Sequence, residues 1–295
     1  MAVYLSNKEV DQLVDPAELV EDVERVLRST GVVAPARLGL EHRGSWLGVM
    51  PSAGQGFYAV KVVGVYPGNP GRGLPLVRGR LFLVDAETGE LLLEADAEAA
   101  TGWRTAAATA VALRLLGGTG GVLGVLGAGV QASYHLRLLT RLYRYEHVMV
   151  YSPTRNRAEK LAAQYGGEVA EPGRLLREAD TVIAATTSRE PVVLGRLLRS
   201  GAVVASVGAP RPVRELDQDT LARAQCVLVD TREGVLSESD DVGEKLVEVV
   251  ELGEALRGVK NCMPGEIRVY KSVGTAILDL AIALHLYRRL GHQDS

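Results

Sequence analysis

The pattern of apolar and polar positions changes near residue 118. After that point, short runs of consecutive apolar residues alternate with segments of helical periodicity. Continuous apolar runs of this length are typical of strands that are buried on both faces of a parallel sheet. They occupy residues 122–126, 148–151, 181–184, 203–207 and 226–229. Strands that alternate with helices in this way predict an α/β fold with a doubly wound parallel sheet.

The N-terminal part of the chain has a different pattern. A capping box at residues 6–9 begins one helix, and Pro16 begins a second helix, which we expect to end at Gly31. Short alternating strands separated by turn residues occupy residues 37–93 and indicate an antiparallel sheet. Because these strands cannot bury both faces of a sheet by themselves, we expect a second subunit to cover one face.

Two further helices and the chain length complete the domain assignment. An alanine-rich helix should span about 103–116, and a last helix, apolar on nearly all sides, should span roughly 274–290. A length of 295 residues suggests about two domains. We therefore expect an α+β domain over residues 1–117, completed by residues 269–295, and a Rossmann dinucleotide-binding domain over residues 118–268.

A glycine motif follows the first apolar run of the second half. The run at 122–126 leads into Gly127-x-Gly129-x-x-Ala132 and then into a helical pattern, which is the context that a dinucleotide fingerprint requires. Gly127 permits a tight turn, Gly129 lets the backbone approach a pyrophosphate, and Ala132 lets the helix pack closely on the strand. The positive end of that helix would then point at the phosphates. We interpret this segment as a nucleotide-binding site.

The end of the second strand bears on the choice between NAD(H) and NADP(H). Sites selective for NAD place an acidic residue there, where it binds the ribose 2′-hydroxyl. This chain has no carboxylate at that point but has Ser152, Thr154 and Arg155, with Arg157 close behind. Hydroxyls and a guanidinium suit a 2′-phosphate, although both arginines could equally be solvated residues at a helix start. The missing acid favours NADP(H) over NAD(H), which stays possible.

Composition excludes several classes of function. The net charge of −3 gives no reason to expect a nucleic-acid or membrane partner, and no apolar run has the length of a spanning helix. The first residues lack the pattern of a secretory signal, so we expect a cytoplasmic protein. Cys226 and Cys262 lack the spacing of metal ligands and are expected to be buried or free thiols. The five histidines are scattered, and no metal site is predicted.

Three cations stand out in the N-terminal half. Lys61 lies in the middle of an apolar strand, where it needs either an outward face or an anionic partner. Arg104 lies at the start of the alanine-rich helix, where a positive charge opposes the helix dipole unless an anion is present. Arg37 precedes the first strand of the predicted sheet. Taken singly, each of the three fits a structural or solvated role.

Taken together, the motifs resemble those of the ornithine cyclodeaminase/mu-crystallin family, which also holds archaeal alanine dehydrogenases and ketimine or pyrroline-carboxylate reductases. The resemblance runs over nearly the whole chain. The matching segments include Met50-Pro51, Val60-Lys61-Val62-Val63, Pro67-Gly68-Asn69-Pro70, Arg104-Thr105-Ala106-Ala107, Gly127-x-Gly129-x-Gln131-Ala132, Ala185-Thr186-Thr187-Ser188, Val207-Gly208-Ala209, Arg214-Glu215-Leu216-Asp217 and Lys271-Ser272-x-Gly274-x-Ala276 with Asp279.

The resemblance implies a homodimer of subunits with an N-terminal substrate-binding and dimerisation domain and a Rossmann domain. It implies that Arg37, Lys61 and Arg104 hold the carboxylate of an amino or imino acid substrate, and that Lys61 is catalytic because it gives or takes a proton at the substrate nitrogen. Together with the motifs above, it assigns cofactor binding to Thr105, Gly127, Gly129, Val130, Gln131, Ser152, Thr154, Arg155, Thr186, Val207, Gly208 and Ser272.

Two departures from the family pattern bear on the reaction. Cyclodeaminases have a glutamate and an aspartate where this chain has Gly48 and Pro210. The resemblance therefore favours a reductase or dehydrogenase acting on an imino or amino acid, and the space left at Gly48 favours a cyclic imine. An ornithine cyclodeaminase that recycles its NAD and a binding protein that holds NADPH without turnover are the alternatives. Glu41 or Asp279 could replace the missing acids, although Asp279 is expected to satisfy a partner at a helix end or interface.

Overall fold

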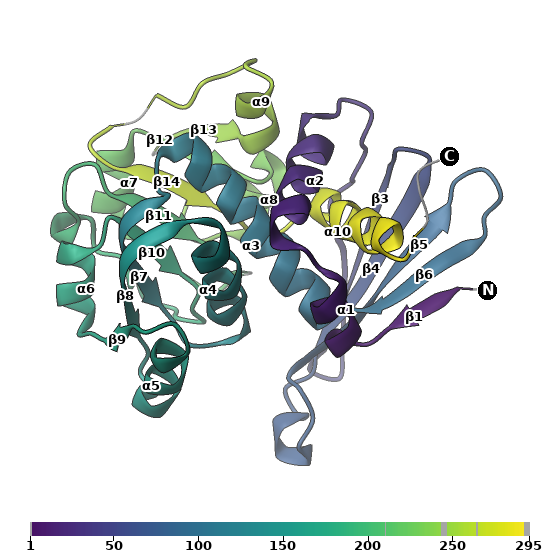
Figure 1. Cartoon of the computed structure of the whole chain (residues 1–295), viewed down its shortest axis with the longest axis horizontal. Helices are drawn as coiled ribbons and strands as arrows, with labels where there is room; N and C mark the ends of the chain where they lie inside the picture. The colour runs from purple at the N-terminus through teal and green to yellow at the C-terminus, as the bar shows by residue number, and fades with distance from the viewer. Residues whose placement is uncertain (1, 210, 243–246, 264, 292–295) are drawn as a thin grey trace. The chain divides into compact units, whose positions relative to one another are not determined.

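The structure is a computed structural model, and it describes residues 2–209, 211–242, 247–263 and 265–291. The chain divides into two compact units (Figure 1): the first consists of Met1–Arg104 with Thr275–Ser295, and the second of Thr105–Gly274. The domain boundaries predicted from the sequence were 117/118 and 268/269. The units differ from that division because most of helix α3 (Ala97–Leu116) and all of strand β14 (Arg268–Lys271) belong with the second unit.

The first unit contains a six-stranded sheet with the strand order β1-β6-β5-β4-β3-β2. Its pairs are antiparallel, as the alternating pattern predicted, except that β1 runs parallel to β6. The strands are β1 (Val3–Leu5), β2 (Leu38–His42), β3 (Ser45–Gly54), β4 (Phe57–Val65), β5 (Val77–Asp85) and β6 (Leu91–Asp96).

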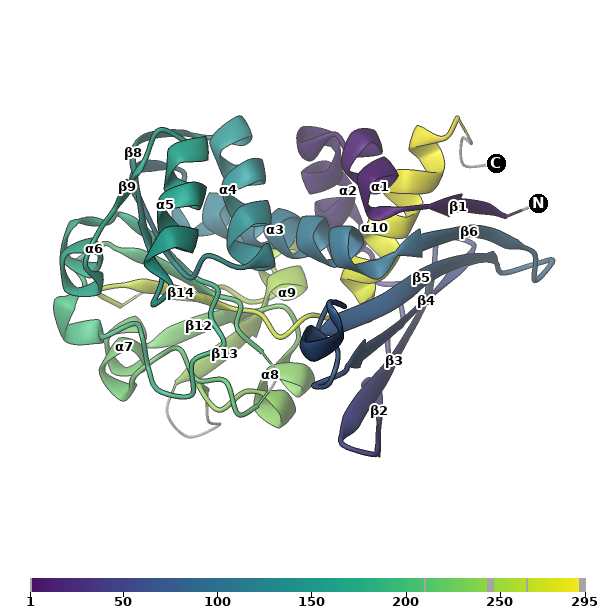
Figure 2. The ribbon, with the colours of Figure 1, turned by 90° about the horizontal axis from the view of Figure 1, so that it is seen from below.

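Helices cover one face of this sheet (Figure 2). They are α1 (Asn7–Leu13), α2 (Pro16–Arg28) and the last helix, α10 (Ala276–Arg289), which packs on α2, β3 and β4. Asp22 of α2 joins α2 to α10 because it pairs with His285 at 2.8 Å and with Arg288 at 2.5 Å. A short 3-10 turn, η1 (Pro70–Arg72), lies between β4 and β5.

Helix ends differ from the predicted ones where distant residues or backbone conformation decide them. Helix α2 ends at Arg28, before Gly31, because Ser29 already has extended backbone angles. Helix α3 begins at Ala97, six residues before the predicted start, and the amide of Ala99 donates to the side chain of Asn7 at 2.9 Å. A first turn completed by a residue so far away in the sequence cannot be read from local periodicity.

The second unit confirms the predicted doubly wound parallel sheet. Its eight strands have the order β13-β12-β14-β11-β10-β7-β8-β9, and all pairs are parallel. The strands are β7 (Gly120–Leu126), β8 (Arg144–Tyr151), β9 (Glu168–Val169), β10 (Thr181–Ala184), β11 (Val203–Ser206), β12 (Cys226–Val229), β13 (Glu248–Glu251) and β14.

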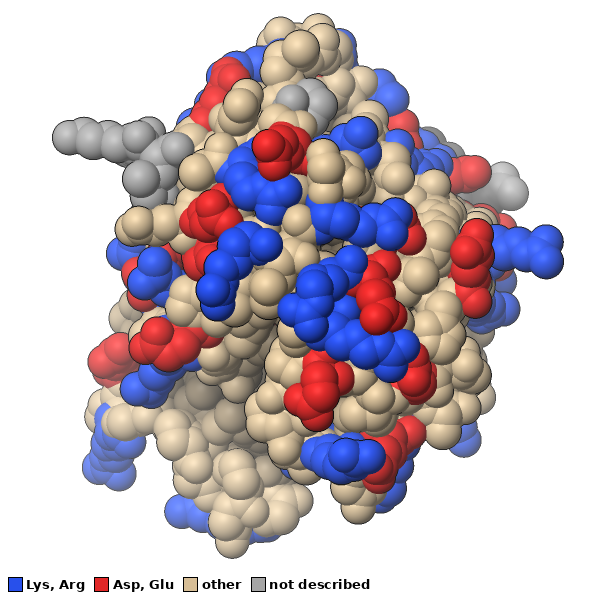
Figure 3. Space-filling view, turned by 90° about the vertical axis from the view of Figure 1, so that its left-hand side faces the viewer, with Lys and Arg blue, Asp and Glu red and all other residues tan. Residues whose placement is uncertain are grey.

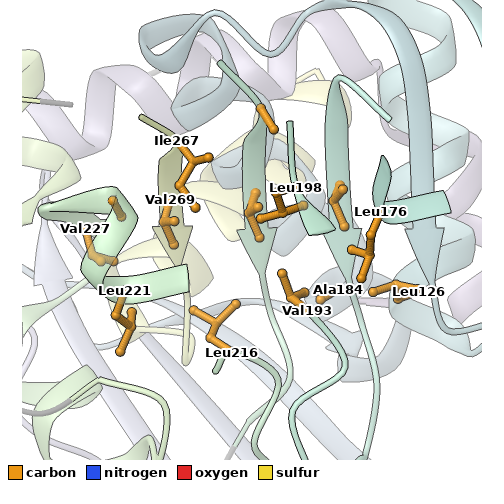
Figure 4. Close-up of a cluster of buried hydrophobic side chains, with 14 of the residues drawn as sticks. Leu126, Leu176, Ala184, Val193, Leu198, Leu216, Leu221, Val227, Ile267 and Val269 are labelled. Carbon is orange, nitrogen blue, oxygen red and sulfur yellow. The ribbon is translucent and has the colours of Figure 1, made fainter. Parts of the chain in front are cut away.

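Helices lie on both faces of this parallel sheet, with α4 and α5 on one face and α7 on the other (Figure 2). The remaining elements of the unit are α4 (Val130–Leu142), α5 (Arg155–Gln164), α6 (Pro172–Glu178), η2 (Gly195–Leu197), α7 (Gln218–Ala224), α8 (Arg232–Glu238) and α9 (Leu252–Leu256). Figure 4 shows the core on one face of the sheet, where Leu126, Leu176, Val193, Leu216 and Val269 pack together. Burying these aliphatic side chains removes apolar area from water and holds the strands in register.

The expectation of free thiols is wrong. Cys226, the first residue of β12, and Cys262 form a disulfide whose Cα atoms are 5.6 Å apart. A sequence separation of 36 residues gave no signal for this pair, because two cysteines without a spacing motif can be brought together only by the fold.

Charged side chains of both signs are interspersed on the face that Figure 3 shows. Ion pairs of the second unit include Arg174–Glu178 and Arg199–Asp180. Within the described ranges, no helix is long and apolar enough to cross a membrane. The same residues include no group of three or more histidine, cysteine or acidic side chains that could hold a metal ion.

Candidate functional site

Lys61 lies at the centre of the first unit's sheet, on the face that α10 covers. It is directly opposite Met50 of β3 and Leu81 of β5, which are both buried. Its side chain is 3% exposed, and Nζ donates a hydrogen bond to Asp279 Oδ1 at 2.9 Å. A lysine on an apolar strand thus has the anionic partner that its burial requires.

Asp279 joins Lys61 to Arg104. Asp279 lies in the first turn of α10, and its Oδ1 is also 3.1 Å from Arg104 Nε on α3. All three residues are almost completely buried and form what we call the Lys61–Arg104–Asp279 cluster. From the sequence, Asp279 was a possible substitute for the missing acids, but it was expected to satisfy a partner at a helix end or interface. Its true partners lie 218 and 175 residues away along the chain, as the differences 279 − 61 and 279 − 104 show.

The electrostatics of the cluster lower the pKa of Lys61 to about 8. Burial is the largest cause, because it penalises the charged ammonium, and the positive charges of Arg104 and Arg37 act in the same direction. The carboxylate of Asp279 opposes them. Arg37 is half-buried, and its charge is the smallest of these contributions to the pKa of Lys61. The printed contacts join two of the three cations that the sequence singled out, Lys61 and Arg104, through Asp279.

Three buried polar atoms of the cluster have no hydrogen-bond partner among the described residues. They are the donors Arg104 Nε, which is only ion-paired with Asp279, and Arg104 Nη1, and the acceptor Asp279 Oδ2. A buried polar group without a partner costs about 1–3 kcal/mol, and more when the group is charged. Unused donors and an unused acceptor on two neighbouring side chains therefore fit a polar ligand that carries both an anionic group and an N–H or O–H group.

The space at Gly48 is not open, which corrects the expectation. Gly48 pairs with Gly39 across β2 and β3, and a Cβ at position 48 would lie 2.3 Å from Trp46 Cη2. A Cβ at Gly39 would lie 2.9 Å from Trp46 Nε1. The indole of Trp46 thus covers both glycines, including position 48, where the sequence analysis noted the missing acid. Glu41 is exposed on β2, opposite Trp46, and position 210 lies outside the described residues.

The glycine motif of the second unit has the geometry that a dinucleotide needs. Gly127 has φ +114°, and a Cβ there would lie 2.3 Å from the carbonyl oxygen of Ala185, so only glycine fits. A Cβ at Gly129 would meet nothing within 4 Å, which leaves the start of α4 open to a ligand. Val130 is exposed there, and Gln131 Oε1 is buried without a partner among the described residues. These features fit a bound pyrophosphate.

The predicted ribose-binding residues lie immediately after the last residue of β8 in the chain. Gly127 donates its amide hydrogen to Tyr151 O at 2.8 Å, so Ser152 lies beside the glycine loop. Ser152 is half-buried, whereas Thr154 and Arg155 are exposed. Arg155 Nε pairs with Glu159 at 2.8 Å on the surface of α5.

A second buried cluster supports the loops at the carboxyl ends of β10 and β11. Glu215 accepts hydrogen bonds from Thr186 N at 2.6 Å, Thr186 Oγ1 at 2.9 Å, Ser206 Oγ at 2.7 Å and Gly208 N at 2.8 Å. A Cβ at Gly208 would lie 2.6 Å from the Glu215 carboxyl carbon. One carboxylate thus fixes both loops. Glu215 belongs to the segment Arg214-Glu215-Leu216-Asp217, but the sequence predicted no role for this carboxylate.

Lys271 and Asp241 complete this network. Lys271 Nζ is fully buried, pairs with Asp241 at 2.7 Å, and donates to Ser206 Oγ and to Gly208 O. Next along the chain, Ser272 Oγ donates to buried Asp230 at 2.8 Å. Val207 is also buried, and Thr105 is buried on α3. The predicted residues at the ends of β10, β11 and β14 are therefore gathered at one edge of the sheet, next to strand β7 and its glycine loop.

A buried histidine on α4 makes stability depend on pH. His135 Nδ1 donates to Gln131 O at 2.8 Å, and Nε2 accepts from Thr109 Oγ1 at 2.9 Å, so the ring has room for only one proton. Burial lowers the pKa of His135 from 6.5 to about 4. The unfolded chain therefore binds the extra proton first, and the stabilisation is complete above pH 6.5 and is lost as the pH falls toward 4.

We expect wild-type protein to lose about 3 kcal/mol of unfolding free energy through this group between neutral pH and pH 4. Urea unfolding of the wild type and of His135→Gln across that pH range measures it. The variant should be less stable at neutral pH but should lose less on acidification. Equal pH dependence in both proteins would show that His135 does not control it.

Comparison with known proteins gives consistent matches over the full chain. The family model described as ornithine cyclodeaminase/mu-crystallin family matches residues 2–294. The ketimine reductase mu-crystallin of Mus musculus is 36% identical over 302 residues, which cover 96% of this chain and 96% of that protein. The alanine dehydrogenase of Archaeoglobus fulgidus is 31% identical, with 97% and 94% covered.

Solved structures also match over nearly the whole length of the chain. The structure of Thermococcus litoralis Δ1-pyrroline-2-carboxylate reductase in complex with NADH and L-proline has a TM-score of 0.89 and 33% identity, and 97% of each chain is covered. The structure of an archaeal alanine dehydrogenase dimer with bound NAD has a TM-score of 0.88 and 28% identity, with 98% of this chain and 95% of that chain covered.

Proposed function

Because the chain belongs to the ornithine cyclodeaminase/mu-crystallin family, as its motifs predicted, we propose that it is an NAD(P)H-dependent oxidoreductase that reduces the C=N bond of an imino acid or, in reverse, oxidises an α-amino acid. The observation that carries this proposal is the Lys61–Arg104–Asp279 cluster with its unused donor and acceptor. Such a site suits a small molecule with a carboxylate and a nitrogen side by side.

The cations of the cluster bind and orient the substrate. Arg104 presents an unused guanidinium nitrogen to the substrate carboxylate, and Arg37 and Lys61 add positive charge around it. Lys61 donates a proton to the substrate nitrogen, for which a pKa of about 8 is well placed, since a general acid works best when its pKa lies near the working pH. The nicotinamide supplies hydride for reduction at the α-carbon.

The cofactor binds along the glycine loop of the second unit. Gly127, Gly129, Val130 and Gln131 hold the pyrophosphate, where an open approach over Gly129 supports the proposal. On the nicotinamide side we assign Thr105, Thr186, Val207, Gly208 and Ser272.

We propose that NADP(H) is preferred over NAD(H), as the sequence analysis favoured. Ser152, Thr154 and Arg155 follow β8 without any carboxylate among them, and they would receive the 2′-phosphate. The exposed Arg155–Glu159 pair has little net energy, so Arg155 can exchange Glu159 for a phosphate. Two similar proteins are described with NADH or NAD, which supports a nicotinamide cofactor in general.

The substrate we propose is a cyclic imine with an uncharged ring, such as pyrroline-2-carboxylate or piperideine-2-carboxylate. Gly48 pairs with Val63 and lies on the same sheet face as Lys61, so the indole of Trp46 presents a flat apolar surface close to the cluster. The three atoms nearest to a Cβ at Gly48 all belong to the indole of Trp46, which is an apolar surface and suits an uncharged ring. A pyrroline-2-carboxylate reductase among the similar proteins agrees with this choice.

We also propose that the protein is a homodimer. The face of the first unit's sheet opposite α10 carries Leu38, Leu40 and Tyr58, which are all exposed apolar side chains. By strand register they share this face with Val62 and Phe82. An apolar surface of this kind on a single sheet face is typical of a protein interface, and a similar alanine dehydrogenase is described as a dimer.

The test is oxidation of NADPH and NADH by the purified protein, followed by absorbance. Pyrroline-2-carboxylate, piperideine-2-carboxylate, and pyruvate with ammonia are offered in parallel, and ornithine with NAD serves as the control for the lyase. We expect oxidation with a cyclic imine, faster with NADPH than with NADH. Ammonia from ornithine without net cofactor change would indicate a cyclodeaminase, and tight NADPH binding without any turnover would indicate a binding protein.

A further inference from the structure

Only one of the two carboxylate oxygens of Asp279 has a partner in the part of the chain that the structure describes. Oδ1 accepts from Lys61 Nζ at 2.9 Å and lies 3.1 Å from Arg104 Nε, whereas Oδ2 is buried and has no hydrogen-bond partner among the described residues. Asp279 is 1% exposed, so water at the surface does not satisfy that oxygen. A charged acceptor left in this state is costly unless the working site supplies a donor.

The other groups of the cluster define what the donor must be. Arg104 Nη1 and the charges of Lys61 and Arg37 account for an anion, but an anion alone would leave Oδ2 unpaired and would face a second negative charge. A ligand with an N–H next to its carboxylate satisfies both sides at once. Amino acids and protonated imino acids have this arrangement, because both groups are attached to the same α-carbon.

We propose that Asp279 Oδ2 accepts a hydrogen bond from the substrate nitrogen and thereby makes Asp279 a substrate-binding residue that selects amino and imino acids over other carboxylic acids. This inference rests on the proposed function and adds a role for a residue outside the three cations. The other oxygen of Asp279, Oδ1, pairs with Lys61 and Arg104. The Asp279 side chain thus positions both Lys61, the proton donor, and the substrate nitrogen, which receives the proton.

Asp279 would stabilise the positive charge that forms on the substrate nitrogen during reduction. Lys61 gives a proton to the imine nitrogen and becomes neutral, and the resulting N–H⁺ is stabilised by the carboxylate of Asp279. A bound reduced nicotinamide would supply the hydride to the α-carbon, and the electron pair of the C=N π bond would become the lone pair of the amine nitrogen. Lys61 recovers its proton from solvent.

The test compares two ligands in two proteins. L-Proline and cyclopentanecarboxylate share a five-membered ring and a carboxylate, but only proline has N–H groups. Each is titrated by calorimetry into wild type and Asp279→Asn, with saturating NADH or NADPH present so that no turnover occurs. We expect the substitution to weaken proline binding by about 10-fold to 100-fold, and to leave cyclopentanecarboxylate unchanged or bound more tightly.

Asp22→Asn is the matched control. Asp22 is also a buried carboxylate paired with cations of α10, but its partners His285 and Arg288 lie far along the helix from Asp279. This variant should lose stability in thermal unfolding without changing the ratio of the two dissociation constants. Equal weakening of both ligands in Asp279→Asn would mean that Asp279 acts only by supporting Lys61 and Arg104, and would overturn the proposal.

A measurement on the wild type keeps the proposal testable if Asp279→Asn does not fold. Tetrahydrofuran-2-carboxylate places a ring oxygen, an acceptor, where proline has nitrogen. It should bind more weakly than cyclopentanecarboxylate, because two acceptors would face each other, and equal or tighter binding would contradict the proposal. If the wild type reduces no imine and binds none of these acids, the proposed function itself fails. If it reduces imines but Asp279→Asn weakens the binding of proline and cyclopentanecarboxylate equally, only the role proposed for Asp279 fails.

Discussion

Replacing Lys61 by alanine should lower kcat for imine reduction by at least about 100-fold while the cofactor still binds. A positioned general acid contributes about 10²-fold to 10⁴-fold to a reaction, and Lys61 is the proton donor that we place at the substrate nitrogen. Asp279 keeps Arg104 as a partner in the variant, so the buried carboxylate is not left without a cation. Steady-state kinetics and titration with NADPH measure the two effects separately.

The pH profile gives this prediction a second readout. Because the pKa of Lys61 is lowered to about 8 and the protonated form is the donor, imine reduction by the wild type should decline as the pH rises through that value. The residual activity of the variant should lack this decline. Lys8→Ala, an exposed lysine of α1, is the control and should match the wild type. Undiminished turnover by the Lys61 variant would remove this residue from the mechanism.

Replacing Glu215 by glutamine should lower the free energy of unfolding by about 3–5 kcal/mol, the usual cost of breaking a buried ionic network by removing one partner. The carboxylate accepts four hydrogen bonds, from Thr186, Ser206 and Gly208. A glutamine has one oxygen and turns two donors toward backbone and hydroxyl groups that also donate. Lys271 would in addition lose the negative charge that lies 4.0 Å away.

The same substitution should weaken NADPH binding, because Thr186 and Gly208 belong to the loops that we assign to the nicotinamide. Urea unfolding and cofactor titration measure the two effects. Glu233→Gln, an exposed carboxylate in the first turn of α8, is the matched control and should change neither. If Glu215→Gln binds the cofactor as tightly as the wild type, the network stabilises the fold without supporting the cofactor site.

Local sequence determined the nucleotide-binding half of the protein well. Five apolar runs and the motif from Gly127 to Ala132 predicted a parallel sheet with a glycine loop before a helix, and the structure confirms that fold. These features are readable because they depend on neighbours in the chain: burial on both faces requires an apolar run, and a tight turn with φ +114° requires glycine. Strand β14 lies inside the sheet but has no such signal, because Arg268 and Lys271 flank only two apolar residues.

Only the tertiary structure decided which charged and reactive groups meet. The sequence singled out Lys61, Arg37 and Arg104, but Asp279 joins Lys61 and Arg104 from the last helix, and Glu215 joins two loops and a distant lysine. The disulfide between Cys226 and Cys262 and the indole of Trp46 over Gly48 overturned two expectations in the same way. Periodicity reports the environment of a side chain, buried or exposed, whereas the identity of its partner depends on how distant elements pack. The family pattern determined the chemistry of this protein, and the packing of α10 on β4 determined the partner of its central lysine.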